Sequence, residues 1–228
     1  MVKFNRGMKR YALIVGAGRG TRMGGEVPKQ FLVLHGRALI WYSIRAFTRA
    51  YPDIEIILVL PEDQLSRAEA LRSDFSTHKF QATAGGETRF DSVRRGLEQV
   101  NEESMVFVHD AVRSMVSVQL IRSCGSVAEE KGNAVPAVAP NDSLRLIDGE
   151  TNKPIERERV RIVQTPQVFP AAILKKAFQQ PFAGQFTDEA SVVEASGVPI
   201  FLVEGEKTNI KITDPKDLYV AEKLLRST

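Results

Sequence analysis

The stretch that most constrains this chain spans residues 11–31, where an apolar run leads into a glycine-rich turn. Residues 12–15 are apolar and bounded by Gly16, a pattern typical of a buried strand. Because glycine has no Cβ, the backbone N–H groups of the turn can crowd around an anion. Arg22 and Lys29, which follows Pro28, add two positive charges to the loop. A strand that ends in such a loop predicts a binding site for phosphate groups.

Two common phosphate-binding motifs do not match this loop. The dinucleotide-binding pattern G-x-G-x-x-G requires a glycine at position 21, where the chain has Thr21. The pattern G-x-x-x-x-G-K-[ST] also fails, because the loop contains no Gly-Lys pair. If the glycines are taken alone, a tight turn without a ligand is an alternative. The longer string, GAGRGTRM at residues 16–23 followed by PKQF at residues 28–31, is more specific.

Composition limits the classes of protein to consider. A chain of 228 residues suits one α/β domain, so we expect residues 1–228 to form a single unit. A net charge of +3, from 31 basic and 28 acidic side chains, does not indicate a nucleic-acid partner. No apolar run approaches the ~20 residues of a membrane span. The single cysteine, Cys124, excludes an intramolecular disulfide and suits the cytoplasm, where we expect a packing role for it.

Strand-like and helix-like segments alternate along the first 140 residues. Strands are predicted at residues 12–15, 54–60, 80–83, 105–108 and 134–138, and helices at residues 39–50, 62–71, 87–100 and 118–130. This alternation predicts an α/β fold with a doubly wound, mostly parallel sheet and right-handed crossovers.

The pattern changes at Pro140. Residues 140–163 reach a turn at Asp148-Gly149 and run back with alternating charges, which predicts a β-hairpin arm. An isolated hairpin is marginally stable in water, so this arm must pack against another protein surface. It is either a mobile surface flap or, as we favour, an arm that grips a second subunit. Beyond it we expect helices at residues 170–180, 188–196 (capped by Thr187) and 214–225, and extended segments at residues 199–203 and 209–212.

The unusual residues follow the ends of three predicted strands. Residues 16–29, 85–92 and 110–113 each come after the carboxyl end of a strand, the edge where open α/β sheets bind ligands. Asp110 is a lone carboxylate without a His or Cys partner at ligand spacing, so it suits Mg²⁺ held with substrate phosphates rather than zinc. The alternative role for Asp110 is a turn cap. We expect its neighbour, His109, to be packed beneath the strand end.

The full string of the first loop resembles the nucleotide-binding signature of the sugar-nucleotide and polyol-phosphate nucleotidyltransferases. Within that group the chain is most similar to the 2-C-methyl-D-erythritol 4-phosphate cytidylyltransferase family, over residues 11–225. The resemblance implies a Rossmann-like nucleotidyltransferase with Mg²⁺ as cofactor. It also implies a reaction in which CMP is transferred from CTP to the polyol phosphate, and a homodimer.

The resemblance also implies roles for individual residues. The catalytic cations would be Arg22, Lys29 and Lys211. The residues implied in CTP binding are Gly16, Ala17, Gly18, Gly20, Gly86, Glu87, Arg89, Ser92 and Ala111. The residues implied in binding the polyol phosphate are Asp110, Arg113, Thr187 and, reaching from the neighbouring subunit, Ser143 and Arg157. Asp110 would also hold the metal.

The residue types present suit this chemistry. A phosphate monoester has a second pKa of about 6, so it attacks as a dianion and needs no general base. The catalyst must instead bring two polyanions together, which fixed cations and positioning can accomplish. The lack of a catalytic triad is therefore consistent with nucleotidyl transfer. The alternative for Arg22, Lys29 and Lys211 is a solvated surface charge.

The chain departs from the family pattern at three places. The first loop reads Val15-Gly16-Ala17-Gly18 where Pro-Ala-Ala-Gly is frequent, Arg19 replaces a small or aromatic residue, and Ser143 replaces threonine.

The motifs also allow two alternative functions. A sister group, the ribitol-5-phosphate cytidylyltransferases, shares the main motifs, so ribitol 5-phosphate is an alternative acceptor. A nucleotide-binding regulatory module without turnover is an alternative of another class.

Overall fold

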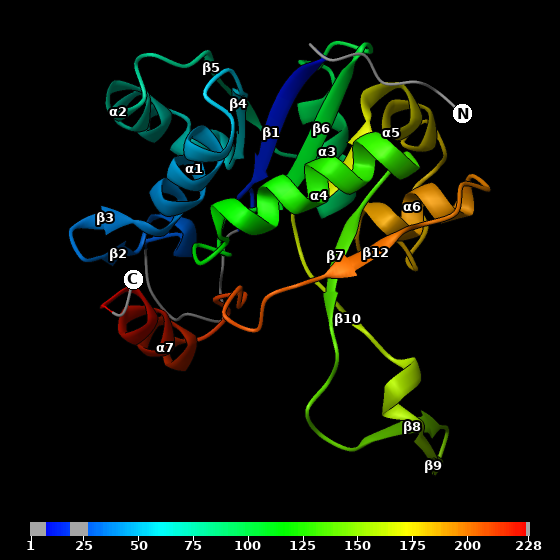
Figure 1. The fold of residues 1–228 in the computed structure, drawn as a ribbon. Coiled ribbons are helices and arrows are strands. Elements are labelled where there is room, and N and C mark those ends of the chain that lie inside the picture. The colour runs from blue at the N-terminus through cyan, green and yellow to red at the C-terminus, as the bar shows by residue number, and fades with distance from the viewer. Residues whose placement is uncertain (1–7, 19–26, 227–228) are drawn as a thin grey trace.

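The protein is built on a five-stranded sheet with the order β11-β6-β1-β4-β5 (Figure 1). The computed structural model describes residues 8–18 and 27–226. The strands are β1 (Lys9–Val15), β4 (Glu55–Leu60), β5 (Phe80–Ala84), β6 (Ser104–Asp110) and β11 (Gln167–Pro170). The first four run parallel, whereas β11 pairs antiparallel with β6 at the edge. The predicted α/β fold with a mostly parallel sheet is confirmed.

Helices cover both faces of this sheet, as a doubly wound fold requires. On one face lie α1 (Leu39–Ala50), α2 (Ser66–Asp74) and α4 (Val118–Lys131). On the other lie α3 (Arg89–Leu97), α5 (Ala171–Ala177) and α6 (Glu189–Ala195). Successive side chains of a strand point to opposite faces, so each strand contributes to two separate cores.

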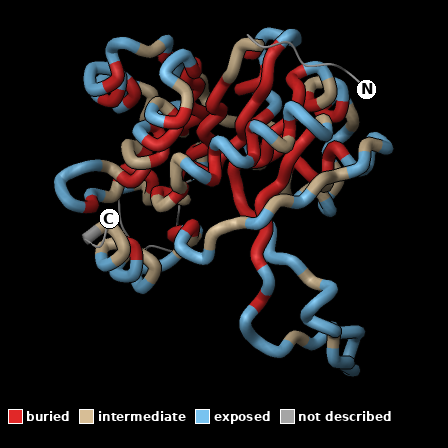
Figure 2. Tube along the Cα trace, in the orientation of Figure 1, coloured by how far each residue is buried: buried red, intermediate tan, exposed pale blue. Residues whose placement is uncertain are grey.

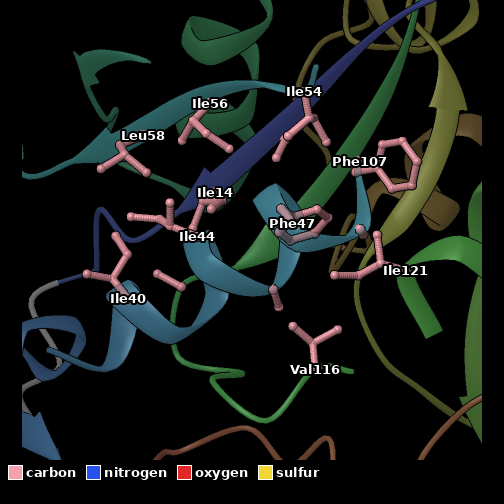
Figure 3. Close-up of a cluster of buried hydrophobic side chains, with 14 of the residues drawn as sticks. Ile14, Ile40, Ile44, Phe47, Ile54, Ile56, Leu58, Phe107, Val116 and Ile121 are labelled. Atoms are coloured by element: carbon pink, nitrogen blue, oxygen red, sulfur yellow. The ribbon is translucent and has the colours of Figure 1, made fainter. Parts of the chain in front are cut away.

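Strand β4 shows why its sequence is apolar throughout residues 56–60. Ile56 and Leu58 pack with Ile44 and Phe47 of α1 in one core (Figure 3). Ile57 and Val59 pack in the other core, under α3. Every residue of β4 is buried, as Figure 2 shows for the centre of the sheet. A parallel strand covered on both faces has no solvent-facing side, so no polar alternation is expected.

A second, three-stranded sheet has the order β10-β7-β12 and leads to the arm. It contains β7 (Val135–Val138), β10 (Ile162–Val163) and β12 (Leu202–Glu204). Beyond it the hairpin of β8 (Leu144–Asp148) and β9 (Thr151–Ile155) protrudes from the body and is mostly exposed (Figures 1 and 2). Gly149 makes its turn at φ +57°, in the left-handed region that favours glycine. The protruding β-arm is confirmed, and its role in dimerisation stays a prediction.

Several elements differ from the sequence-based expectations. The antiparallel strand β11 and the short hairpin of β2 (Val33–Leu34) and β3 (Arg37–Ala38) were not predicted. The helix predicted at residues 62–71 begins as a 3-10 turn, Glu62–Gln64, and becomes α2 only at Ser66. Residues 209–212, which were expected to be extended, join no sheet; their contacts go to loops, and Ile212 N donates to Val112 O at 3.0 Å. The remaining elements are the 3-10 turns Lys29–Phe31 and Arg157–Arg159 and the helix α7 (Pro215–Arg226).

The cap of α6 also corrects the prediction. Asp188, not Thr187, is the N-cap, and its side chain accepts a hydrogen bond from Ser191 N at 2.9 Å. The Ser191 hydroxyl accepts in turn from Asp188 N at 3.3 Å, which completes a capping box.

Within the described ranges, no helix is long and apolar enough to cross a membrane.

Candidate functional site

A cavity of about 180 Å³ lies at the carboxyl-terminal edge of the parallel strands. Strands β1 and β6 end side by side there, with Val15 paired to Asp110. The residues of the predicted site that line the cavity are Gly16, Ala17, Gly18, Lys29, Gly86, Glu87, Arg89, Ser92, Asp110 and Lys211. The predicted convergence of three loops on one crevice is therefore what the fold produces. Two further predicted residues, Gly20 and Arg22, lie outside the described residues.

The first loop is fixed to the sheet at its start. Gly16 N donates to Val59 O at 2.8 Å, and the buried Gln30 side chain donates to Gly16 O at 2.5 Å. A Cβ added at Gly16 would lie 3.0 Å from the Cβ of Ala111, so glycine permits this close approach of the loops after β1 and β6. Lys29 follows as the first residue of a 3-10 turn and faces the same cavity.

The second loop packs directly against the first. A Cβ added at Gly85 would lie 2.2 Å from the Cβ of Ala17, a separation that real side chains do not show. Gly86 N donates to the Ser92 hydroxyl at 3.1 Å, and that hydroxyl donates to Thr88 O at 2.9 Å. Thr88 caps α3 by accepting from Asp91 N at 3.0 Å. Glycine at position 85 is thus required by the contact between the two loops.

Asp110 stands at the centre of a group of cations. Its Oδ1 accepts from Arg89 Nε and Nη2 at 3.3 and 3.2 Å, and its Oδ2 accepts from Lys211 Nζ at 2.9 Å. Arg113 Nε lies 3.6 Å from Oδ2. Burial alone would raise the pKa of Asp110, but Arg89 and Lys211 hold it well below its usual range. The carboxylate is therefore charged whenever the protein is near neutral pH.

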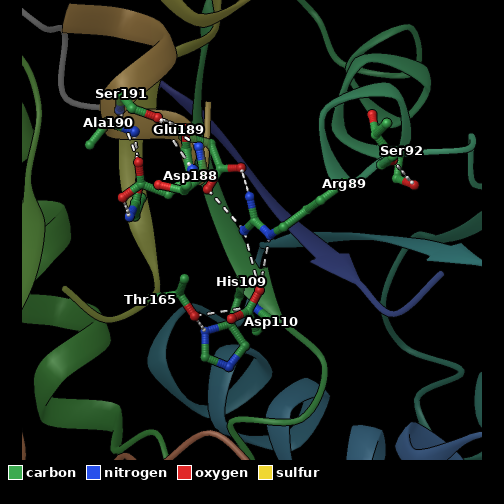
Figure 4. A network of polar contacts seen from close by, with 12 residues as sticks. Arg89, Ser92, His109, Asp110, Thr165, Asp188, Glu189, Ala190 and Ser191 are labelled. Carbon is green, nitrogen blue, oxygen red and sulfur yellow. Dashed lines mark hydrogen bonds and ion pairs between the residues drawn. The ribbon is translucent and has the colours of Figure 1, made fainter. Parts of the chain in front are cut away.

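Arg89 also binds a second carboxylate, that of Glu189 at the start of α6 (Figure 4). Arg89 Nη1 donates to Glu189 Oε1, and Nη2 donates to Oε2 at 3.1 Å. The Glu189 side chain is fully buried. Burial alone would lower the pKa of Arg89, but the two carboxylates raise it above its usual value. Arg89 lines the cavity, yet most of its N–H groups point to carboxylates; its predicted contact with CTP stays a prediction.

His109 is packed beneath the strand end, as expected. The ring is fully buried, 5.2 Å from the ring of Phe47, and its nitrogens lie 3.0 Å from Thr165 Oγ1 and 3.2 Å from Arg113 O. Burial lowers the pKa of His109 to about 4, so the ring is neutral at pH 7. The Thr165 hydroxyl also accepts from Asp110 N at 3.1 Å (Figure 4), so Thr165 helps to fix the backbone of the central carboxylate.

Lys211 reaches the cavity from the segment before α7. The fully buried Asn209 anchors this segment by donating to Thr165 O at 2.9 Å, and Asn209 O accepts from Arg113 Nη1 at 2.8 Å. Two residues beyond Lys211, Thr213 N donates to the carboxylate of Asp217 at 2.7 Å. Lys211 is therefore held by contacts on both sides, although its sequence neighbours form no strand.

Asp217, on α7, interacts electrostatically with Lys29, the other predicted catalytic lysine. Burial alone would raise the pKa of Asp217, but hydrogen bonds from Thr213 and Asp214 and the charge of Lys29 lower it. The start of α7 thus connects the surroundings of Lys29 and Lys211.

The remaining predicted residues do not line the cavity. Ala111 is buried beside Gly16, and Arg113 is largely buried and bound to Asn209 O. Thr187 is exposed near the start of α6. Ser143 and Arg157 are exposed on or beside the arm, where Arg157 Nη1 donates to Asn141 O at 3.2 Å.

Sequence reasoning assigned no role to Glu189 or Asn209. Both are fully buried polar residues. A glutamate at the first turn of a predicted helix is ordinary, so no local signal separated Glu189 from a surface residue.

The donor set limits the kind of metal that can bind. Among the described residues, no group of three or more His, Cys, Asp or Glu side chains could hold a metal ion. A zinc site, which needs three or four protein ligands, does not fit this part of the chain. A lone ionised carboxylate at the wall of this cavity does fit Mg²⁺, which is bound mainly by substrate phosphates and water.

Comparisons with known proteins agree with one another. A family model described as "IspD: 2-C-methyl-D-erythritol 4-phosphate cytidylyltransferase" matches residues 11–227. A protein of Bacteroides fragilis with the name 2-C-methyl-D-erythritol 4-phosphate cytidylyltransferase is 44% identical over 219 residues, covering 96% of this chain and 100% of its own. A Porphyromonas gingivalis protein of the same name is 43% identical over 223 residues, covering 96% and 99%.

Solved structures extend the likeness to three dimensions. The crystal structure of 2-C-methyl-D-erythritol 4-phosphate cytidylyltransferase from Thermus thermophilus has a TM-score of 0.76 at 35% identity, covering 94% of this chain and 98% of that chain. The 4-diphosphocytidyl-2C-methyl-D-erythritol synthase of Anaerococcus prevotii has a TM-score of 0.84 at 24% identity, covering 96% and 99%, and supports the fold alone.

Proposed function

Because the chain belongs to the 2-C-methyl-D-erythritol 4-phosphate cytidylyltransferase family and is therefore a nucleotidyltransferase, we propose that it transfers CMP from CTP to 2-C-methyl-D-erythritol 4-phosphate. The products are 4-diphosphocytidyl-2-C-methyl-D-erythritol and pyrophosphate. The observation that carries the proposal is the glycine-walled cavity into which Lys29, Lys211 and Asp110 converge from distant parts of the sequence.

In the proposed reaction a phosphate oxygen of the acceptor attacks the α-phosphorus of CTP. A new P–O bond forms there, the bond to the bridging oxygen of the β-phosphate breaks, and the electron pair leaves with pyrophosphate. The acceptor phosphate is largely dianionic above its second pKa of about 6, so no side chain has to remove a proton. Lys29, Lys211 and Arg22 would neutralise charge on the reacting phosphates, and the loops around Gly16 and Gly86 would hold CTP.

Asp110 would hold Mg²⁺ together with the phosphates of CTP. When bound, the metal supplies positive charge that stabilises the leaving pyrophosphate. The low pKa of Asp110 keeps an anionic oxygen at the cavity wall, and Lys211 Nζ at 2.9 Å from Oδ2 would share this carboxylate with the metal. Arg113 would bind the phosphate of the acceptor, and Thr187 would contact the acceptor as well.

We also propose that the chain works as a homodimer in the cytoplasm. The arm carries Leu146 and Ile147, which are 46% and 70% exposed, and a second subunit would cover them. Ser143 and Arg157 would then reach the cavity of the neighbouring subunit. A single buried cysteine, Cys124, suits a reducing compartment.

The arm can be tested by mixing two inactive variants. If sites are shared, Arg157→Ala subunits mixed with Lys29→Ala subunits will form some heterodimers in which one site is complete, so part of the activity returns. If subunits exchange but activity does not return, the arm does not complete the neighbouring site.

The reaction is tested by pyrophosphate release from CTP and Mg²⁺ with each of two acceptors. We expect kcat/KM for 2-C-methyl-D-erythritol 4-phosphate to exceed that for ribitol 5-phosphate by at least about 100-fold, because a site that hydrogen-bonds the hydroxyl groups of one acceptor rejects an analogue that presents them differently. The reverse order would assign the chain to the ribitol phosphate reaction. Release with neither acceptor would refute the proposal.

A further inference from the structure

Arg89 joins two carboxylates that belong to different layers of the fold. Asp110 ends strand β6 of the sheet, whereas Glu189 begins α6 on one face of it. The guanidinium donates four hydrogen bonds, two to Asp110 Oδ1 and two to the oxygens of Glu189 (Figure 4). Since a guanidinium has five N–H donors, little of Arg89 is left for a ligand.

Glu189 is held in place independently of Arg89. Gln167, on the edge strand β11, donates to Asp188 Oδ2 at 2.8 Å and accepts from Ala190 N at 2.8 Å. These bonds tie the first turn of α6 to β11, which pairs with β6. The Glu189 carboxylate, which is fully buried, therefore has a fixed position relative to Asp110.

The two oxygens of Asp110 have different partners. Among the described residues, Oδ1 accepts from Arg89 alone, whereas Oδ2 accepts from Lys211 at 2.9 Å and lies 3.6 Å from Arg113 Nε. A guanidinium can bind a carboxylate through both oxygens at once. Here Glu189 accepts from Nη1 and Nη2 of Arg89, and Lys211 binds Oδ2 of Asp110, so Arg89 meets Asp110 through Oδ1.

We propose that Glu189 and Arg89 are positioning residues of the active site, in which Glu189 holds the Arg89 guanidinium on one oxygen of Asp110 and thereby keeps the other oxygen for Lys211 and the bound substrates. This inference rests on the proposed cytidylyltransferase function, because it assigns Asp110 and Lys211 to that reaction. A buried ion pair contributes little net stability on average, which agrees with a role in geometry rather than in folding.

Loss of the Glu189 charge then has a defined consequence. In a Glu189→Gln variant the side chain keeps its size, but Arg89 loses its stronger partner and moves onto both oxygens of Asp110 or into the cavity. Either movement disturbs Lys211. Substitutions behind a metal-binding or catalytic carboxylate typically cost about 10- to 100-fold in activity or affinity.

The test is a double-mutant cycle of Glu189→Gln and Arg89→Gln, with Glu194→Gln as control. Glu194 is an exposed residue of the same helix, so its substitution leaves activity unchanged. We expect Glu189→Gln to lower kcat/KM by about 10- to 100-fold. The double variant should be no less active than Arg89→Gln alone, because Glu189 acts through Arg89. Losses that multiply, or wild-type activity of Glu189→Gln, would overturn the proposal.

A second variant covers the case in which Glu189→Gln does not fold. The Arg89 side chain is 29% exposed, so a smaller cation is tolerated there. The Arg89→Lys variant keeps the positive charge, but a lysine ammonium cannot bridge two carboxylates as a guanidinium does. It should fold with a melting temperature near that of the wild type and lose at least about tenfold in kcat/KM. An Arg89→Lys enzyme with wild-type kcat/KM would contradict the positioning role.

Binding separates this inference from the proposed function. If the wild type releases no pyrophosphate, the proposed function fails, but calorimetric binding of CTP with Mg²⁺ to the same variants still measures the coupling. The proposal then requires weaker binding by Glu189→Gln and no additional loss in the double variant. Equal CTP affinity of all variants would overturn it.

Discussion

A methyl group at Gly85 tests whether contact between the two glycine loops forms the nucleotide site. In Gly85→Ala the new Cβ would lie 2.2 Å from the Cβ of Ala17 and 2.9 Å from Ser92 Oγ, whereas ordinary contacts lie at 3.4–4 Å. Gly85 cannot easily retreat, because its N–H donates to Leu60 O at 2.8 Å and its carbonyl accepts from Arg95 Nη1 at 2.7 Å. Ala17 must therefore move, and the first loop moves with it.

The size of the effect follows from this geometry. Inserting a methyl group into a close-packed contact costs about 1–3 kcal/mol. If the first loop moves away in the free enzyme, it must return to its original position when CTP binds, so this free energy weakens CTP binding. Each 1.4 kcal/mol changes the affinity tenfold. We therefore expect the KM for CTP to rise about 5- to 150-fold. If the folded state absorbs the strain instead, the melting temperature should fall by roughly 2–12 °C for a chain of this size.

The assay measures both quantities on three variants. Gly184→Ala is the matched control, because a Cβ at Gly184 meets nothing within 4 Å and should change neither KM nor melting temperature. Gly85→Ala combined with Ala17→Gly removes the 2.2 Å contact and should recover at least about half of the lost free energy. If Gly85→Ala keeps both the KM and the melting temperature of the wild type, the loops are not in the contact on which this reasoning depends.

Three further predictions test other parts of the molecule. Lys29→Ala should lower kcat by at least about 10³-fold, as loss of a transition-state cation does; near-normal turnover in pyrophosphate release would remove Lys29 from the reaction. Burial raises the pKa of Cys124 to about 12, so iodoacetamide at pH 8 should label it only after denaturation; rapid labelling of the native protein would contradict its burial. Burial alone would raise the pKa of Glu55, but hydrogen bonds from Lys9 and Lys79 lower it below the ordinary value of 4.5. A lowered pKa stabilises the folded state above the unfolded value and loses that contribution as pH falls through the folded one. In denaturant titrations Glu55→Gln should therefore cost about 1 kcal/mol at pH 7 and less at pH 3, and an equal cost at both would refute the pairing.

The sheet was predictable because its signals are local. Residues 54–60 are nearly all apolar, so the sequence itself indicates a strand that is buried on both faces, as β4 is. The helical spacing of residues 39–50 matches the bounds of α1. The convergence of three loops followed from a general rule about parallel strands, without any knowledge of side-chain positions. What could be predicted was thus the element type and the edge of the sheet that binds ligands.

The parts that were missed depend on distant contacts. Strand β11 has only four residues, and its antiparallel pairing with β6 crosses more than fifty residues of chain, so no periodic pattern indicates it. The segment of residues 209–212 was expected to be extended, and it pairs with no strand of either sheet. It is held instead by the Asn209 side chain and by Ile212 N, which bond to loops that the sequence could not place beside it.

The same distinction applies to the charges of the site. The sequence indicated the cations but not their partners, because Glu189, Asp110 and Asp217 come from three separate segments. In the fold, Lys211 meets Asp110 at 2.9 Å, Arg89 lies between Asp110 and Glu189, and Lys29 lowers the pKa of Asp217. Cations fixed by carboxylates before the ligand arrives need little reorganisation when charge develops on phosphorus, which is the condition for electrostatic catalysis. A residue that orients such a cation can therefore matter to the rate as much as one that touches the substrate, and it is found only by following each charge to its partner.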